Sequence, residues 1–296
     1  MIRCLITVLA LLIAHSSLRA EEVKTRHRGL VINANLEVAP GKGIENGVVM
    51  IVHGLLAHNR MELIAALQRL FQERGISTLA VNLSLGIDDR HGFFDCSRLH
   101  THRPADALDE IDAWIGWLKA NGATDIALLG HSQGGAQVAR YAAERRDPSV
   151  SAVILMAPAT FDPDRVAASY RQRYGTELEP ILSRAQELLR AGYGETRMEQ
   201  IGFLSCENAT ATAASVAGWY APSPLRHTPV LLPRIEQRTL VVIAGADTVV
   251  PDLAGAVPRQ AGKGDLTVHT VEGADHFFLD LYADEAAETI ADWLGR

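Results

Sequence analysis

Residues 125–135 read DIALLGHSQGG, and they join a predicted buried strand to a predicted helix with Ser132 at the turn between them. The spacing G-x-S-x-G also arises by chance, so the position of the motif matters more than its letters. A serine on such a tight turn needs neighbours without side chains, and Gly130 and Gly134 meet that need. Free N–H groups at the start of the helix could hold an oxyanion. The pattern predicts a nucleophile at Ser132, with a simple helix cap as the alternative.

Strands and helices alternate on both sides of this turn. Continuous apolar runs indicate strands that are buried on both faces, whereas residues 28–38 alternate apolar and polar side chains, as an edge strand would. The further strands are expected at 47–52, 78–83, 125–129, 150–156, 239–244 and 266–271, and helices at 59–74, 104–121, 133–146 and 280–294. This order predicts an α/β fold with a mostly parallel central sheet flanked by helices.

Residues 158–237 break the alternation. They begin with a charged helical pattern and continue with small polar residues, and no strand pattern is apparent in them. We therefore expect a helical cap insertion over the sheet. The predicted division is a signal peptide at residues 1–20, a core at 21–157 and 238–296, and the cap at 158–237.

Two later strand ends supply an acid and a base. Asp247 follows the strand at 239–244, and His276 lies in the loop after the strand at 266–271. Active sites of open α/β sheets lie at the carboxyl ends of the strands, so both side chains are expected near Ser132. A serine hydroxyl needs such a base, held by an acid, to act as a nucleophile. The alternatives are a turn-forming Asp247 and a loop histidine without a catalytic role.

Taken together, three segments carry a family resemblance. Residues 130–135 (GHSQGG), 245–247 (GAD) and 273–276 (GADH) resemble the α/β-hydrolase superfamily in its order Ser, Asp, His. The resemblance extends from residue 48 to residue 294 and implies the α/β-hydrolase fold. One departure is the sequence His-Gly-Leu-Leu at 53–56, which differs from the glycine-rich run of some lipases and esterases.

The resemblance assigns a role to each matching residue. It implies Ser132 as nucleophile, His276 as base and then acid, and Asp247 as the residue that orients the imidazole. It also implies that the backbone N–H groups of Leu55 and Gln133 form the oxyanion hole. A serine nucleophile speaks against the epoxide hydrolases and haloalkane dehalogenases of this fold, whose nucleophile is a carboxylate.

Residues 88–102 are dense in possible metal ligands, but no paired short spacings fix a zinc geometry. We therefore predict no metal site, and we expect this loop to shape the substrate pocket. Asp88, Asp89 and Arg90 are expected to form a solvated ion-pair network. His53 is expected to be structural.

The composition and net charge argue against a protein that binds nucleic acid. The 296 residues are 48% apolar and 21% charged, with a net charge of −7 and no basic block, which argues against a nucleic-acid binder.

Residues 1–20 combine Arg3, an apolar run and a small residue, Ala20, before Glu21. This pattern predicts a signal peptide cleaved after Ala20 and a periplasmic or secreted protein without stable membrane insertion. A retained amphipathic anchor is the alternative.

Removal of the signal peptide leaves Cys96 and Cys206 as the two cysteines. In an exported protein two thiols can pair, and we predict a disulfide, with two unpaired buried cysteines as the alternative.

The predicted function is that of an exported serine hydrolase that cleaves a carboxylic ester or thioester through an acyl-enzyme, without cofactor or metal. Its expected partner is a small-molecule acyl ester. A peptidase or amidase of the same fold and a non-catalytic binding protein are the alternatives. The sequence leaves the acyl chain length, lid motion and oligomeric state open.

Overall fold

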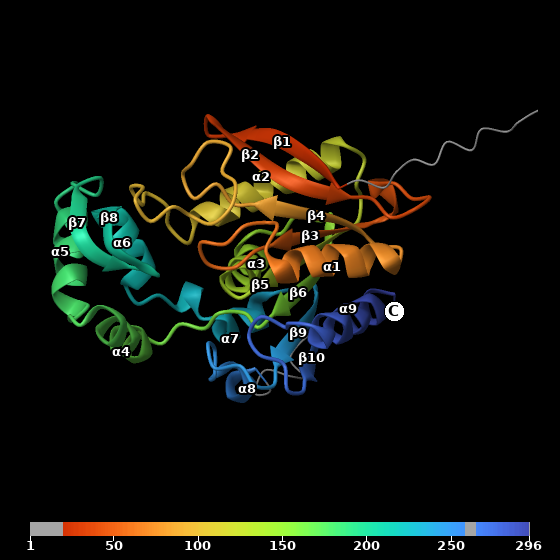
Figure 1. Cartoon of the computed structure of the whole chain (residues 1–296). Helices are drawn as coiled ribbons and strands as arrows, with labels where there is room; N and C mark the ends of the chain where they lie inside the picture. The colour runs from red at the N-terminus through yellow and green to blue at the C-terminus, as the bar shows by residue number, and fades with distance from the viewer. Residues whose placement is uncertain (1–19, 258–264, 296) are drawn as a thin grey trace, which may run out of the picture.

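An eight-stranded sheet forms the centre of the computed structural model, which describes residues 20–257 and 265–295 (Figure 1). The predicted signal peptide, apart from Ala20, lies outside the described residues. The strands in sheet order are β1 (Glu21–His27), β2 (Leu30–Glu37), β4 (Ser77–Asn82), β3 (Val48–Val52), β5 (Ile126–His131), β6 (Val150–Met156), β9 (Arg238–Ala244) and β10 (Leu266–Val271). From β4 to β10 all neighbours are parallel, whereas β1 and β2 pair antiparallel with each other and β2 with β4.

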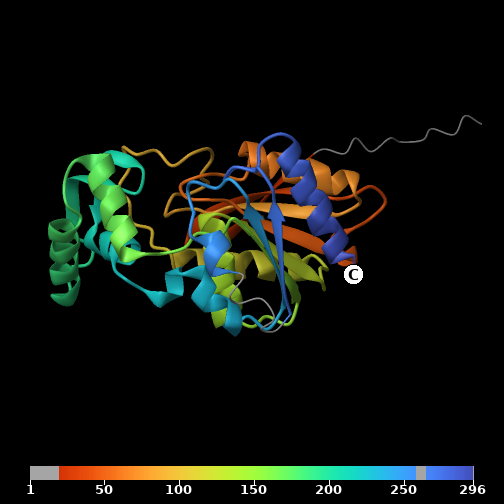
Figure 2. The ribbon, with the colours of Figure 1, turned by 90° about the horizontal axis from the view of Figure 1, so that it is seen from below.

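Helices cover both faces of the sheet, as expected from the buried apolar strands. Helices α1 (Glu62–Glu73) and α9 (Leu281–Leu294) pack on one face, and α2 (Asp106–Ala120) and α3 (Gln133–Glu144) on the other (Figure 2). Each face thereby buries its own apolar core. The predicted mostly parallel sheet between two helical layers is confirmed.

The amino-terminal edge of the sheet differs from the prediction. Within residues 28–38 a strand does form, β2, but β1 pairs along its length and takes the edge position. The sequence of β1, EEVKTRH, alternates exposed and half-buried side chains and carries four charged residues. Charges of this kind are typical of an edge strand, because they disfavour pairing with the strands of other chains. A search for apolar runs therefore does not detect β1.

The inserted segment forms a separate layer beside the sheet (Figure 1). Its elements are α4 (Pro163–Tyr174), α5 (Glu179–Arg190), β7 (Arg197–Phe203), β8 (Cys206–Thr212) and α6 (Ala213–Tyr220). The expectation of a purely helical cap is wrong, because β7 and β8 form an antiparallel two-stranded sheet. The buried side chains of β8 include Ala209 and Ala211, which are too small to produce an obvious strand pattern.

Short elements connect these parts. They are η1 (Ile44–Asn46), η2 (Pro224–Arg226), α7 (Thr228–Leu231), η3 (Leu232–Arg234) and α8 (Leu253–Ala256). Leu231 and Leu232 are buried in the same core as α3, so the chain returns to the sheet layers within the segment predicted as cap. In the part of the chain that the structure describes, no helix has the length and apolar character needed to cross a bilayer.

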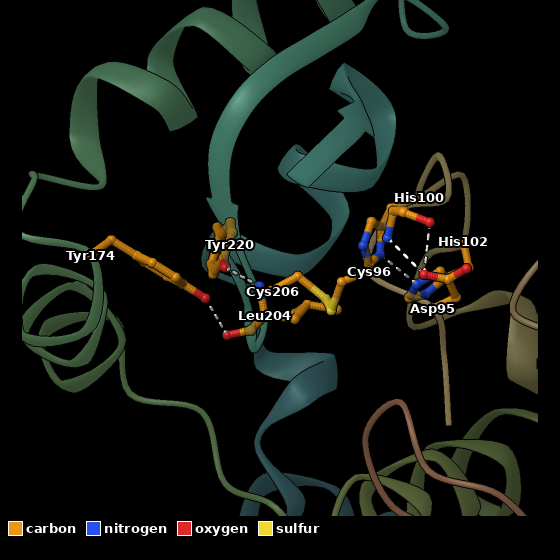
Figure 3. Close-up of a disulfide and its surroundings, with 9 residues drawn as sticks. Asp95, Cys96, His100, His102, Tyr174, Leu204, Cys206 and Tyr220 are labelled. Atoms are coloured by element: carbon orange, nitrogen blue, oxygen red, sulfur yellow. Dashed lines mark hydrogen bonds between the residues drawn. A yellow bond between two sulfur atoms is a disulfide. The ribbon is translucent and has the colours of Figure 1, made fainter. Parts of the chain in front are cut away.

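The cap is tied to the loop that follows β4. Cys96 in that loop and Cys206 at the start of β8 form a disulfide with a Cα–Cα distance of 5.4 Å, as predicted (Figure 3). The N–H of His100 donates to the carbonyl of Thr210 at 2.9 Å, so the loop also pairs with β8. The indole N–H of Trp219 donates to the carbonyl of His102 at 3.0 Å. Covalent and hydrogen bonds therefore fix the position of the cap.

We expect the Cys96→Ser, Cys206→Ser double variant to lose about 2–4 kcal/mol of unfolding free energy. The two cysteines are 110 residues apart, so the bridge restricts a long loop of the unfolded chain. Urea unfolding with and without a reducing agent measures the effect. The wild type should lose stability on reduction and the double variant should not; equal behaviour of the two would contradict the prediction.

Candidate active site

Ser132 occupies a strained turn between β5 and α3. Its φ of 55° and ψ of −120° lie in a region that non-glycine residues rarely adopt. A Cβ on Gly130 would lie 2.4 Å from the carbonyl oxygen of Gly134, and one on Gly134 would lie 2.4 Å from that of Val52. The two glycines are therefore required by the close approach of the helix to the strands. The turn lifts the serine side chain to the carboxyl end of the sheet.

The structure brings the three predicted side chains together at this edge. The hydroxyl of Ser132 donates to Nε2 of His276, with Oγ and Nε2 2.8 Å apart. Nδ1–H of the same ring donates to Oδ2 of Asp247 at 2.8 Å. The carboxylate therefore holds the imidazole in the tautomer that leaves Nε2 free to accept a proton. Asp247 follows β9 and His276 follows β10, which are parallel neighbours in the sheet.

The carboxylate of Asp247 accepts hydrogen bonds from His276 and from the backbone of its own turn. Its Oδ1 accepts the N–H groups of Val249 at 2.7 Å and Val250 at 2.9 Å, so the turn-forming interpretation also holds. Burial raises the pKa of Asp247, but the hydrogen bonds from His276 and from these N–H groups outweigh it, and the pKa lies below its ordinary value. The carboxylate is thus ionised at neutral pH and faces His276 as an anion.

The backbone donors predicted for the oxyanion hole lie beside Ser132. Leu55 and Gln133 line the same cavity as Ser132. Within residues 20–257 and 265–295, neither of their N–H groups has a hydrogen-bond acceptor. Gln133 begins α3, where the first N–H groups of a helix have no partner in the helix and attract negative charge. These donors are free to bind an oxygen of a substrate.

Two further histidines support the site. Nε2–H of His131 donates to the carbonyl of His276 at 2.8 Å and so fixes the loop that carries that residue. Burial lowers the pKa of His131 to about 4, so its ring is neutral. His53 is structural, as expected: it donates from Nδ1 to the carbonyl of Gly54 and accepts the N–H of Leu83 at Nε2. Sequence reasoning missed the role of His131, because its partner is 145 residues away.

Arg90 corrects the expectation of a solvated ion-pair network. It is 4% exposed and donates to backbone carbonyls of Leu83, Ala57 and Gly92. Asp88 and Asp89 do lie near the surface, where Asp89 pairs with Lys24. Arg90 therefore connects the loop after β4 to the turn that contains Leu55, rather than to solvent.

The residues that the structure describes contain one group of three potential metal ligands that lie together, Glu22, Asp89 and His91. It lies at the exposed edge of β1, and the ammonium group of Lys24 is 3.1 Å from Glu22 and 2.5 Å from Asp89. Lys24 thus already forms an ion pair with each of the two carboxylates. We assign no function to this group.

Two cavities meet at Ser132. The first, which we call the cap cavity, has a volume of about 270 Å³ and lies toward α4 and α6; besides Ser132, Leu55 and Gln133, its lining includes Tyr220 and Arg226. The second, which we call the α1 cavity, has a volume of about 550 Å³, is mostly apolar, and is lined by Ser132, His276, Phe277, Met61 and Ile64 among others. Ser132 thus has space on two sides.

Comparison with known protein families gives one match that covers most of the chain. Residues 48–293 match the family model described as "Alpha/beta hydrolase family". Comparison with curated protein sequences gives no match.

Solved structures share the fold. Est1E from Butyrivibrio proteoclasticus matches with a TM-score of 0.65 and 19% identity over 92% of this chain and 97% of that one. A monoacylglycerol lipase from Paleococcus ferrophilus matches with a TM-score of 0.61 and 20% identity over 89% and 98%. The esterase domain of a Rhodothermus marinus protein matches with a TM-score of 0.60 and 17% identity over 93% and 97%.

Proposed function

The chain belongs to the alpha/beta hydrolase family, and on that premise we propose that it is a serine hydrolase that cleaves a carboxylic ester or thioester through an acyl-enzyme. The observation that carries the proposal is the pair of 2.8 Å contacts that join Ser132 to His276 and His276 to Asp247. A hydroxyl within hydrogen-bond reach of a base, which is itself held by a carboxylate, is the arrangement that activates a serine.

In the proposed first step, Oγ of Ser132 bonds to the ester carbonyl carbon while its proton moves to Nε2 of His276. The carbonyl oxygen becomes an oxyanion that accepts the N–H groups of Leu55 and Gln133; loss of one such donor typically costs about 3–4 kcal/mol in the transition state. The bond from carbon to the leaving oxygen or sulfur then breaks. His276 returns the proton to the leaving group, and Asp247 stabilises the imidazolium between the two transfers.

In the second step water replaces the leaving group. His276 accepts a proton from water while the water oxygen bonds to the acyl carbon. The bond between carbon and Oγ then breaks, and the proton returns to Ser132. Every proton has a donor and an acceptor among these residues and water, so the proposal invokes no cofactor.

The structural neighbours agree with this class of reaction but do not define the substrate. They are described as an esterase domain and a monoacylglycerol lipase, and Est1E has been solved with ferulic acid bound. At about 20% identity, the similarity to these structures establishes a shared fold but not a shared substrate.

We also propose that the protein is exported. The pattern of residues 1–20 favours a signal peptide, and the disulfide between Cys96 and Cys206 supports an oxidising compartment, since disulfides are rare in the cytosol.

The test compares esters with amides that share the acyl group. We expect p-nitrophenyl esters from acetate to octanoate to be hydrolysed with kcat/KM at least about a hundredfold above that of the matching p-nitroanilides, because an anilide needs more help in leaving. Equal turnover of both would favour an amidase. Absence of turnover across the panel, with the acyl compounds still bound, would favour a non-catalytic binding protein.

A further inference from the structure

Positive charge is concentrated in the cap cavity. Three arginines line it, Arg165 and Arg173 from α4 and Arg226 from η2, and no acidic side chain is among its lining residues. The whole chain, by contrast, has a net charge of −7. Cationic side chains grouped beside Ser132 in an otherwise acidic protein create a local positive potential. Such a potential attracts a negatively charged group.

One of the three arginines already has that partner. Arg165 forms an ion pair with Asp252 and donates to the hydroxyl of Thr160 at 2.6 Å. In the described part of the chain, no carboxylate forms an ion pair with Arg173 or Arg226. Arg173 extends exposed from α4. Two positive charges of the cavity are therefore left without a counter-ion of the protein.

Arg226 is held in place by groups that do not neutralise it. Its guanidinium carbon lies 4.1 Å from the centre of the Phe161 ring and 5.6 Å from a ring of Trp219, and Nη1 donates to the carbonyl of Trp219. Nε is buried and, among the described residues, has no hydrogen-bond partner. Burial lowers the pKa of Arg226 to about 10, so it keeps its charge at neutral pH. Arg226 as a whole is half-buried. A cation partly withdrawn from water without a counter-ion is costly, and a bound anion would offset part of that cost.

The position of His276 indicates which part of an ester enters the cap cavity. His276 lines the α1 cavity but not the cap cavity, whereas Gln133 lines the cap cavity. The leaving group must be within reach of the imidazole that protonates it, so it occupies the α1 cavity. The acyl group then extends from Ser132 into the cap cavity, toward Arg173 and Arg226.

The remaining walls of the cap cavity suit a carbon chain. The hydroxyl of Tyr170 donates to the backbone carbonyl of Gly202. That of Tyr174 donates to the carbonyl of Leu204, and that of Tyr220 accepts the N–H of Leu204 (Figure 3). Since the phenol oxygens are engaged with the backbone, the rings offer mainly apolar surface to the cavity. A chain of methylene groups ending in an anion matches a cavity with aromatic walls and unpaired arginines.

We propose that the acyl group of the substrate is a short chain that ends in a carboxylate, held by Arg173 and Arg226, so that the enzyme hydrolyses half-esters of dicarboxylic acids. The proposal rests on the proposed function, because it takes Ser132 as the acylated residue. A volume of about 270 Å³ is small for a ligand site, which favours a short chain.

The test compares two esters that differ only in charge. Monoethyl adipate and ethyl hexanoate have the same leaving group and the same acyl chain length, and a pH-stat measures the hydrolysis of both. We expect kcat/KM of the wild type to be at least about tenfold higher for the half-ester, as one charge-assisted hydrogen bond can provide. A ratio of one or less would overturn the proposal.

Variants attribute the preference to the arginines. Arg173→Gln and Arg226→Met should each lower the ratio of the two kcat/KM values by about tenfold. Arg171→Gln is the matched control: Arg171 is also exposed on α4, but it pairs with Glu177 and does not line the cap cavity, so its removal should leave the ratio unchanged. The exposed Arg173 tests the proposal even if Arg226→Met does not fold. An unchanged ratio in Arg173→Gln and in any folded Arg226 variant would overturn it.

A binding measurement separates failure of this proposal from failure of the proposed function. Adipate is titrated into the Ser132→Ala protein by calorimetry, which requires no turnover. If neither ester is hydrolysed, the proposed function fails; saturable binding of adipate that Arg173→Gln weakens would still support the anion site. If esters are hydrolysed but adipate does not bind and the half-ester has no advantage, the anion site alone is wrong.

Discussion

Replacement of Ser132 by alanine is expected to lower kcat/KM for the preferred ester by about six orders of magnitude. The variant loses the hydroxyl that donates to Nε2 of His276 at 2.8 Å, and an acyl-enzyme can no longer form. What remains is catalysis by binding and by the N–H groups of Leu55 and Gln133. Initial rates at high enzyme concentration measure the loss.

The fold should survive this substitution. Alanine removes one oxygen and leaves Gly130 and Gly134 in place, so thermal unfolding should change little. Near-wild-type activity in the folded variant would show that another group performs the chemistry. Loss of activity together with loss of the fold would be resolved by Ser132→Gly, which relieves the strained φ of 55° and equally lacks the hydroxyl.

Replacement of Asp247 by asparagine is expected to lower kcat by about four orders of magnitude without unfolding the protein. The amide oxygen can still accept the N–H groups of Val249 and Val250, so the turn is kept. The amide N–H₂ group would then donate to Nδ1 of His276. This forces the proton of the ring onto Nε2, which can no longer accept the proton of Ser132.

Steady-state kinetics and urea unfolding of the same preparation measure both parts of this prediction. Asp275→Asn is the matched control, because Asp275 precedes His276 but is exposed, and among the described residues its carboxylate accepts only the N–H of Phe277. Its kcat should stay within about threefold of the wild type. A large loss of stability in Asp247→Asn with little effect on kcat would give Asp247 a structural role alone.

The sheet and the three central side chains follow from the sequence for a simple physical reason. Strands covered on both faces, such as β3 (Val48–Val52), are apolar throughout, so the sequence shows where they begin and end. The carboxyl ends of parallel strands meet at one edge, so residues that follow β5, β9 and β10 had to lie near one another. The disulfide needed only the count of cysteines and the expected compartment.

Other features depend on packing that no local pattern records. The strand β1 is charged because it forms the edge, and β8 carries small buried residues where α6 packs against it. Arg173 and Arg226 are separated in the chain by α5, β7, β8 and α6, and they line one cavity only in the folded cap. The buried position of Arg90 depends on carbonyls of its own loop, from Leu83 and Gly92, and on that of Ala57 in a distant turn.

The most direct test of the central claim is covalent labelling of the nucleophile. Diethyl p-nitrophenyl phosphate transfers its diethyl phosphoryl group to an activated serine oxygen and releases p-nitrophenolate. Intact-mass spectrometry of the wild type should show the addition of one such group, peptide mapping should locate it on Ser132, and Asp247→Asn should react far more slowly. An unlabelled wild type, or a label on another residue that persists in Ser132→Ala, would contradict the account.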